Sequence, residues 1–172
     1  CASYANKYVG IALDQGLDKY FSSNISITAD EEECAFETNG IPNHNFNDSD
    51  VNFVNKVNAV SRSFSISRNP VPLSSFIELS QKKWDAIMLN GVVVDLLSAG
   101  CYRPNDNKAD TSGNVQSGCL FNEEKWLLDP LFENNDFGAD SHNAHAQPDG
   151  TYHYHGNPHA VFENESSEQE SP

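Results

Sequence analysis

The chain has 172 residues and a formal net charge of −15, from 25 acidic and only 10 basic side chains. So few Lys and Arg residues, scattered along the chain, cannot assemble a basic patch, which argues against nucleic acid and anionic membrane surfaces as partners. The length is that of about one domain, and no stretch approaches the ~20 consecutive apolar residues of a transmembrane segment.

The N-terminal part of the chain carries short segments of strand character, apolar or alternating with period two. These segments are residues 8–13, 25–28 and 61–68. An acidic turn at 30–33 and a loop with Gly and Pro at 39–45 separate them. The pattern predicts a mainly β fold, an antiparallel sandwich or barrel-like sheet with long loops and at most one or two short helices.

The clearest local signal is an apolar hairpin around Asn90-Gly91. Residues 87–89 and 92–94 are apolar and flank this pair, and Asn-Gly between apolar runs favours a two-residue type I′ turn. Because both arms are apolar throughout, we expect this hairpin to lie deep in the core.

The C-terminal half contains few further elements. Asn122, followed by two glutamates, predicts the start of one short helix over 122–129. The segment 163–172 is acidic, Ser-rich and without apolar residues, which is typical of a flexible tail. We therefore expect a single β domain over residues 1–162 and a tail over 163–172.

Four cysteines, none in a CxxC pair, indicate disulfides rather than a thiolate metal site. We expect Cys101–Cys119, which would close a polar loop, and Cys1–Cys34 as the second pair. Disulfides imply an oxidising location, so the protein is expected to be secreted, periplasmic or associated with the cell envelope. Cys1 has two further interpretations. It could carry a lipid anchor, because mature bacterial lipoproteins begin with Cys, or it could be an ordinary cysteine.

Histidines concentrate near the C-terminus, where five of the six fall between positions 142 and 159. Among them, Pro148-Asp149-Gly150 has the composition of a type I turn followed by a left-handed glycine, the three-residue hairpin loop with a G1 bulge. The resulting register pairs Ala146 with Tyr152, His145 with His153, Ala144 with Tyr154, and Asn143 with His155.

This register gives the hairpin two different faces. Small alanines opposite large tyrosines make a packed core face, and His145, His153 and His155 line the other. Opposed Cβ atoms lie ~4.5–5.5 Å apart, so three imidazoles can converge on one ion at ~2.0–2.1 Å from each nitrogen. The pattern predicts one transition metal ion, copper or zinc. The alternative is a polar strand face on which each side chain is satisfied separately.

Other residues are candidates for the same site. His142 and Asp140 could add a ligand or an outer hydrogen bond, and His44 could arrive from its loop, whereas a solvated position is favoured for His159. Calcium is conceivable at the Asp- and Asn-rich segments 43–50 and 105–110, but ordinary turn chemistry is favoured there.

Several segments resemble the YHYH domain family, named for the motif Tyr152-His153-Tyr154-His155. The segment 39–44 is similar to the family's Asn-Gly-Ile-Pro-x-His segment, and the segment 89–92 is similar to its Asn-Gly-Val element. Asp140 together with residues 145–156 is similar to its C-terminal core. The resemblance covers roughly residues 35–162. It implies a secreted or envelope protein and ties His44 to the hairpin, but it implies no activity.

Three functions follow from these features, and whether the protein is an enzyme stays open. The first is a metal-binding protein that stores, senses or delivers copper or zinc; methionine-based Cu(I) handling is not supported, since Met88 is the only methionine. The second is a hydrolase using metal-bound water, with Asp140 as general base and His44 as acid or substrate contact. The third is an adhesion module in which Trp84 and Trp126 contact carbohydrate, although a core position is favoured for both.

Overall fold

The computed structural model describes residues 1–49, 53–80, 82–98, 129–131 and 138–158, which form two four-stranded β-sheets. The first sheet has the order β1 (Asn6–Asp14), β2 (Lys19–Ala29), β3 (Glu33–Thr38), β4 (Arg62–Ser67). The second has the order β5 (Ala86–Ile87), β6 (Val93–Val94), β8 (Tyr152–Tyr154), β7 (Ala144–Ala146). Within these ranges the one helix is the 3₁₀ turn η1 (Ala2–Tyr4). The predicted mainly β fold is confirmed, as two sheets rather than a closed barrel.

The first sheet is an antiparallel meander that buries one face. Its serines and charged residues alternate with apolar ones, so every second side chain of β2 and β3 points inward. The inward residues are Ser23, Ile25, Ile27, Cys34, Phe36 and Thr38, all buried. The predicted strands at 8–13 and 25–28 fall within β1 and β2, and the predicted strand at 61–68 contains β4 with one extra residue at each end.

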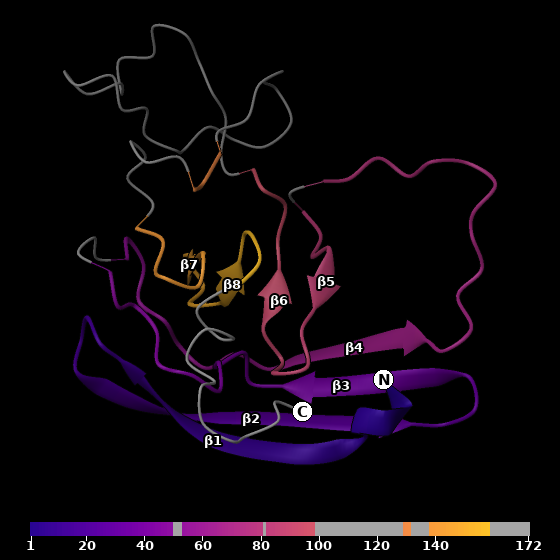
Figure 1. Ribbon diagram of the computed structural model, residues 1–172, viewed down its shortest axis with the longest axis horizontal. Coiled ribbons are helices and arrows are strands. Elements are labelled where there is room, and N and C mark those ends of the chain that lie inside the picture. The colour runs from indigo at the N-terminus through magenta and orange to yellow at the C-terminus, as the bar shows by residue number, and fades with distance from the viewer. Residues whose placement is uncertain (50–52, 81, 99–128, 132–137, 159–172) are drawn as a thin grey trace, which may run out of the picture.

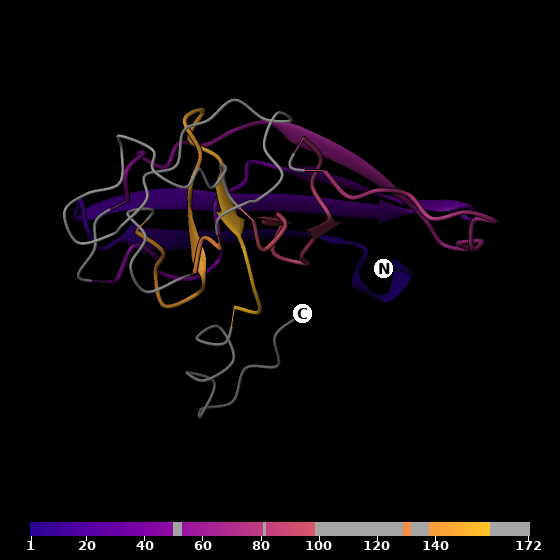
Figure 2. The same ribbon diagram turned by 90° about the horizontal axis from the view of Figure 1, so that it is seen from above.

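The second sheet lies on this buried face of the first (Figure 1). Seen from above, β7 and β8 cross over the strands of the first sheet (Figure 2). The pairs β5–β6 and β7–β8 are antiparallel hairpins, and the pair β6–β8, which joins the two hairpins, is parallel. The two hairpins are therefore neighbours in space although some 50 residues separate them in the chain.

Two apolar clusters hold the sheets together. One gathers β7 and β8 with the loop after β3: Ala12, Ile41, Phe46, Val57, Val92, Ala144, Ala146, Tyr152 and Tyr154. The other joins Ile87 and Leu89 of the β5–β6 hairpin to the inner face of β2 and β3. Thr38 Oγ1 also donates to the carbonyl of Gly91 (3.1 Å).

The Asn90-Gly91 hairpin forms, but the predicted two-residue type I′ turn is wrong. Met88 N donates to Val92 O and Gly91 N donates to Met88 O, so the loop has three residues and Gly91 adopts φ +83°. A type I′ turn needs positive φ at both central residues. Asn90 instead uses its side chain to accept from Val92 N. The expected deep burial holds for Val92 and Val93 but not for the first arm, which is partly exposed.

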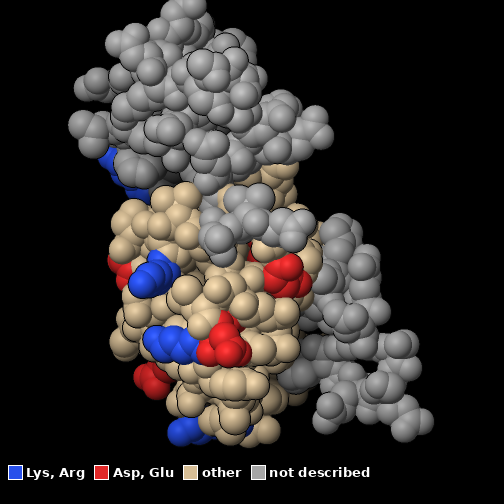
Figure 3. All heavy atoms as spheres, turned by 90° about the vertical axis from the view of Figure 1, so that its left-hand side faces the viewer, with Lys and Arg blue, Asp and Glu red and all other residues tan. Residues whose placement is uncertain are grey.

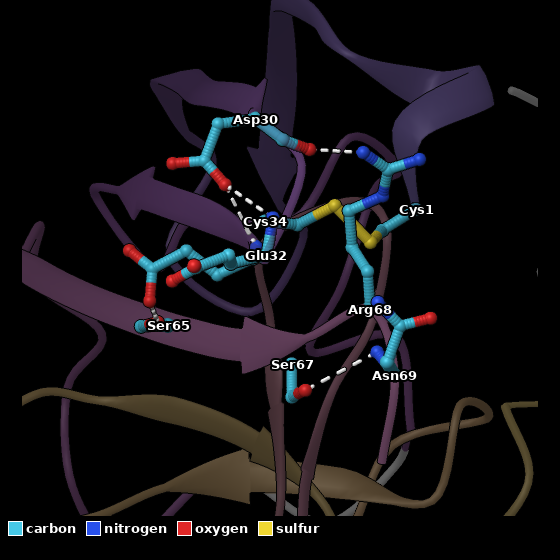
Figure 4. Close-up of a disulfide and its surroundings, with 9 residues drawn as sticks. Cys1, Asp30, Glu32, Cys34, Ser65, Ser67, Arg68 and Asn69 are labelled. Atoms are coloured by element: carbon cyan, nitrogen blue, oxygen red, sulfur yellow. Dashed lines mark hydrogen bonds between the residues drawn. A yellow bond between two sulfur atoms is a disulfide. The ribbon is translucent and has the colours of Figure 1, made fainter.

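The predicted pair Cys1–Cys34 is confirmed as a disulfide that joins the N-terminus to β3 (Figure 4). Around it, Arg68 donates to the carbonyl of Asp30. The sulfur of Cys1 is therefore bonded to Cys34, and a lipid anchor at Cys1 stays a prediction.

Several sequence-based expectations lie outside the described residues. These are the pair Cys101–Cys119, the helix at 122–129, the segment 105–110, Trp126, His159 and the tail at 163–172. No helix among the described residues has the length and apolar character needed to cross a membrane. On the face shown in Figure 3, the acidic and basic side chains of the described residues are interspersed.

Candidate metal centre

The histidine hairpin has the predicted turn and the predicted register. Gly150 N donates to Gln147 O, Gln147 N donates to Thr151 O, and Gly150 adopts φ +90°. The pairs Ala144–Tyr154, His145–His153 and Ala146–Tyr152 face each other, and His155 N bonds to Asn143 O. The period of two then places the alanines and tyrosines in the core and the three histidines on the opposite face.

On that face the three imidazole rings converge. His155 Nε2 lies 3.0 Å from His145 Nε2 and 2.9 Å from His153 Nε2. One ligand atom from each of these residues lies within 4.8 Å of the others, and the described residues contain no other group of three metal-ligating side chains. All three residues are buried, with 8%, 1% and 4% exposure for His145, His153 and His155.

Backbone contacts indicate which ring nitrogen faces the centre with a free lone pair. His155 Nδ1 lies 2.6 Å from Leu96 O and His153 Nδ1 lies 3.2 Å from Thr151 O. A carbonyl oxygen only accepts, so each Nδ1 must carry the proton and donate it. In the neutral ring Nε2 is then an acceptor, and the Nε2 atoms of these two rings present lone pairs to each other across 2.9 Å.

Burial keeps these rings neutral. It lowers the pKa of His153 well below its usual range, and the neighbouring His145 and His155 add to the shift. Burial likewise lowers the pKa of His155 to about 4. Neutral imidazole is the form that binds a metal.

The separations of the nitrogen atoms suit one small ion. Ligands ~2.0–2.1 Å from a tetrahedral zinc ion stand about 3.3–3.4 Å apart. The observed 2.9 and 3.0 Å therefore need to widen by only a few tenths of an ångström. Trp84 packs against His153 with ring centroids 5.6 Å apart, and Arg62 lies over the Trp84 ring, so Trp84 is a packing residue of this centre.

The tyrosines of the motif make separate polar contacts on the core side of the hairpin. Tyr154 Oη lies 2.7 Å from His44 Nε2 and accepts from Asn90 Nδ2 at 3.0 Å. His44 Nδ1 lies 2.7 Å from Asn45 O, so Nδ1 is the donor and Nε2 accepts the Tyr154 proton. Both ring nitrogens of His44 are thus occupied.

Asp140 is the second residue on the core side that bonds to a tyrosine of the motif. Its Oδ1 accepts from the backbone N of His142 and Ala144, and its Oδ2 accepts from Tyr152 Oη at 2.8 Å and from Asn47 N at 3.1 Å. Four donors explain how a buried carboxylate is tolerated here.

The structure therefore does not bring three of the predicted site residues to the triad of His145, His153 and His155. His44, His142 and Asp140 form their own cluster across the hairpin, where the rings of His44 and His142 contact each other at a tilt of 37°, with centroids 3.9 Å apart. His142 Nδ1 is buried without a hydrogen-bond partner. In the Asp- and Asn-rich segment, Asp48 accepts from Ser141, which is turn and loop chemistry rather than a cation site.

Two residues next to the triad, Asp95 and Leu96, were not among those predicted for the site. Asp95 is buried at 8% exposure and follows β6, and Leu96 O holds His155. The one available signal was that Asp95 interrupts an apolar strand whose neighbours Val93 and Val94 are largely buried. Local patterning did not show that β6 pairs with β8.

Fold and site together define a two-sheet β protein with a buried centre of three histidines. A family model described as "YHYH protein" matches residues 63–172, and the chain belongs to this family. The match runs from β4 through the motif, so the Asn39–His44 segment precedes it. No curated protein and no solved structure matches the chain.

Proposed function

We propose that this protein binds one transition metal ion, copper or zinc, through Nε2 of His145, His153 and His155. The observation that carries the proposal is the convergence of three buried imidazoles, two of which have Nδ1 committed to backbone carbonyls. Facing lone pairs at 2.9 Å repel each other unless a cation lies between them. A bound ion removes this repulsion and offsets the desolvation of the rings.

We infer a role in binding rather than turnover. The hydrolase alternative assigned general-base and acid roles to Asp140 and His44, and both residues instead bond to tyrosine hydroxyls on the core side. The imidazoles are almost fully buried, which suits retention of an ion. The disulfide supports a secreted or periplasmic location, where storage, sensing or delivery of copper or zinc would take place.

The test is the metal content of protein purified without a histidine tag, with affinity measured by competition against a chromophoric chelator. Wild type should bind one ion per chain. His153→Ala and His155→Ala should each weaken binding at least 100-fold, because two imidazoles form a far poorer site than three.

His142→Ala is the matched control, since it removes a buried histidine three residues before His145 on the opposite face. It should leave stoichiometry and affinity unchanged. If the His153→Ala and His155→Ala variants retain as much metal as the wild type, the proposed site is wrong.

A further inference from the structure

A buried carboxylate, Asp95, lies on the same face of the second sheet as the histidine triad. Strand β6 runs parallel to β8 with Val93 opposite His153 and Val94 opposite Tyr154. Asp95 N donates to Tyr154 O at 2.8 Å, which continues the ladder by one residue. Residues in register on neighbouring strands point to the same side of a sheet, so Asp95 accompanies His155 on the triad face.

Hydrogen bonds link Asp95 to Leu96, whose carbonyl holds His155, and to Gln147. Asp95 Oδ1 accepts from Leu96 N at 2.8 Å, and the carbonyl of Leu96 accepts from His155 Nδ1. On the other side, Gln147 Nε2 lies 3.5 Å from Asp95 Oδ2. Gln147 follows His145 by two residues, so it lies on the same face.

The negative charge of Asp95 has no counterion among the described residues, where the one ion pair is Arg62–Asp149. Two further acidic groups lie near: Asp85 acts on Asp95 and Asp129 acts on His155. Burying an unpaired carboxylate is unfavourable. Because Asp95 lies on the sheet face that carries the three imidazoles, a dication held by those imidazoles would supply the missing positive charge.

We propose that Asp95 is the charged member of this metal centre, the residue that makes it select a divalent ion over Cu(I). Three imidazoles alone carry no charge and accept either class of ion, whereas the added carboxylate favours the ion of higher charge. Asp95 is not part of the compact ligand group, so it would act on the ion from an outer position, through its negative charge. This inference rests on the proposed metal-binding function.

The test is the ratio of affinities for two ions of different charge in Asp95→Asn, which keeps the shape and removes the charge. Affinity for Zn(II) should fall about 10–100-fold, the usual cost of losing an outer partner of a metal site. Affinity for Cu(I), measured without oxygen with ascorbate as reductant, should fall less than about threefold. Asp85→Asn, an exposed acid of the same hairpin, is the control and should change the ratio much less.

A purely structural role predicts a different result, in which the Asn variant weakens both ions equally and lowers the midpoint of unfolding without metal. The charge role predicts no fall in that midpoint. Asp95→Ser, smaller and also uncharged, provides a second measurement of the ratio if the Asn variant folds poorly. An unchanged Zn(II)/Cu(I) ratio overturns the role of Asp95 when His153→Ala still weakens binding as expected. If His153→Ala has no effect either, the proposed function itself fails.

Discussion

At the scale of single residues, the tyrosines and the histidines of the Tyr-His-Tyr-His motif lie on opposite faces of the hairpin. Tyr152 and Tyr154 bond to polar groups on the core side, Asp140 and His44, and the histidines meet on the other side. Because successive side chains of a strand point to opposite faces, one tetrapeptide can supply core hydrogen bonds on one side and metal-ligating imidazoles on the other.

Tyr154→Phe tests the anchoring role of the hydroxyl. The variant leaves His44 Nε2 without its partner, whereas Asn90 Nδ2 still donates to Asn43 Oδ1 at 3.2 Å. One unsatisfied, partly buried group costs about 1–3 kcal/mol in the free energy of unfolding. Denaturant titration should show a loss in this range, while affinity for zinc changes by less than about fivefold. A large loss of affinity with unchanged stability would place the tyrosine in the metal site instead.

His44 predicts a pH dependence of stability. Burial lowers its pKa to about 4 from the ordinary 6.5, so the folded state favours the neutral ring. The unfolded chain takes up a proton near pH 6.5 and the folded chain only near pH 4, so stability falls as the pH drops through this window and is constant above it. A difference of one pKa unit corresponds to about 1.36 kcal/mol in the free energy of unfolding. Because the ring is partly exposed to solvent, we expect less than this rate gives for the full pKa difference, a loss of about 2 kcal/mol.

His44→Gln isolates this contribution, because Gln cannot titrate and other groups cancel in the difference. Unfolding should be measured with chelator present at pH 7, 5.5 and 4. Wild type should lose more stability than the variant over this range, by about 2 kcal/mol. If the free energy of unfolding changes with pH equally in wild type and variant, folding does not lower the pKa of His44.

At the scale of elements, the second sheet depends on two tight turns that each contain a left-handed glycine. A Cβ on Gly150 would approach Asn58 Cβ at 2.7 Å, and φ is +90°. Asn58 N also donates to Gly150 O at 3.0 Å, so this turn is fastened to the chain that precedes β4.

Gly150→Ala should therefore destabilise the protein by about 1–3 kcal/mol, from backbone strain and displacement of Asn58. It should also weaken metal binding, since the turn sets the register of His145 against His153. Gly10→Ala is the control, because its Cβ would meet only Ser23 Cβ at 3.8 Å without positive φ. Equal effects of both substitutions on thermal unfolding and zinc affinity would argue against the role of the turn.

At the scale of the whole molecule, the first sheet supports the second. Its inner face carries the β5–β6 hairpin through Ile25 and Thr38, and that hairpin brings Asp95 and Leu96 beside β8. The Cys1–Cys34 disulfide ties the N-terminus to this support, but neither cysteine belongs to the metal centre.

Replacing both residues, as in Cys1→Ala with Cys34→Ala, should lower the free energy of unfolding by about 2–5 kcal/mol. The stoichiometry of metal binding should stay at one ion per chain at temperatures where the variant is folded. Denaturant unfolding and elemental analysis of the same sample measure both quantities. Loss of the ion from the folded variant would show that the disulfide and the centre are coupled.

The sequence by itself determined the histidine hairpin, because turn chemistry and strand period are local properties. Pro148 to Gly150 specifies the loop, the loop specifies the register, and the register places three imidazoles on one face. The cysteine count left three pairings open, and Cys1–Cys34 was predicted as the pair that remains once Cys101–Cys119 closes the polar loop.

Only the tertiary structure decided what surrounds the centre. The parallel pairing of β6 with β8 depends on non-local packing of two hairpins on the first sheet, and no local signal encodes it. This pairing puts Asp95 beside His155. The same packing drew His44 and Asp140 to the tyrosine hydroxyls, because a buried hydroxyl must find a partner and these groups lay within reach on the core side.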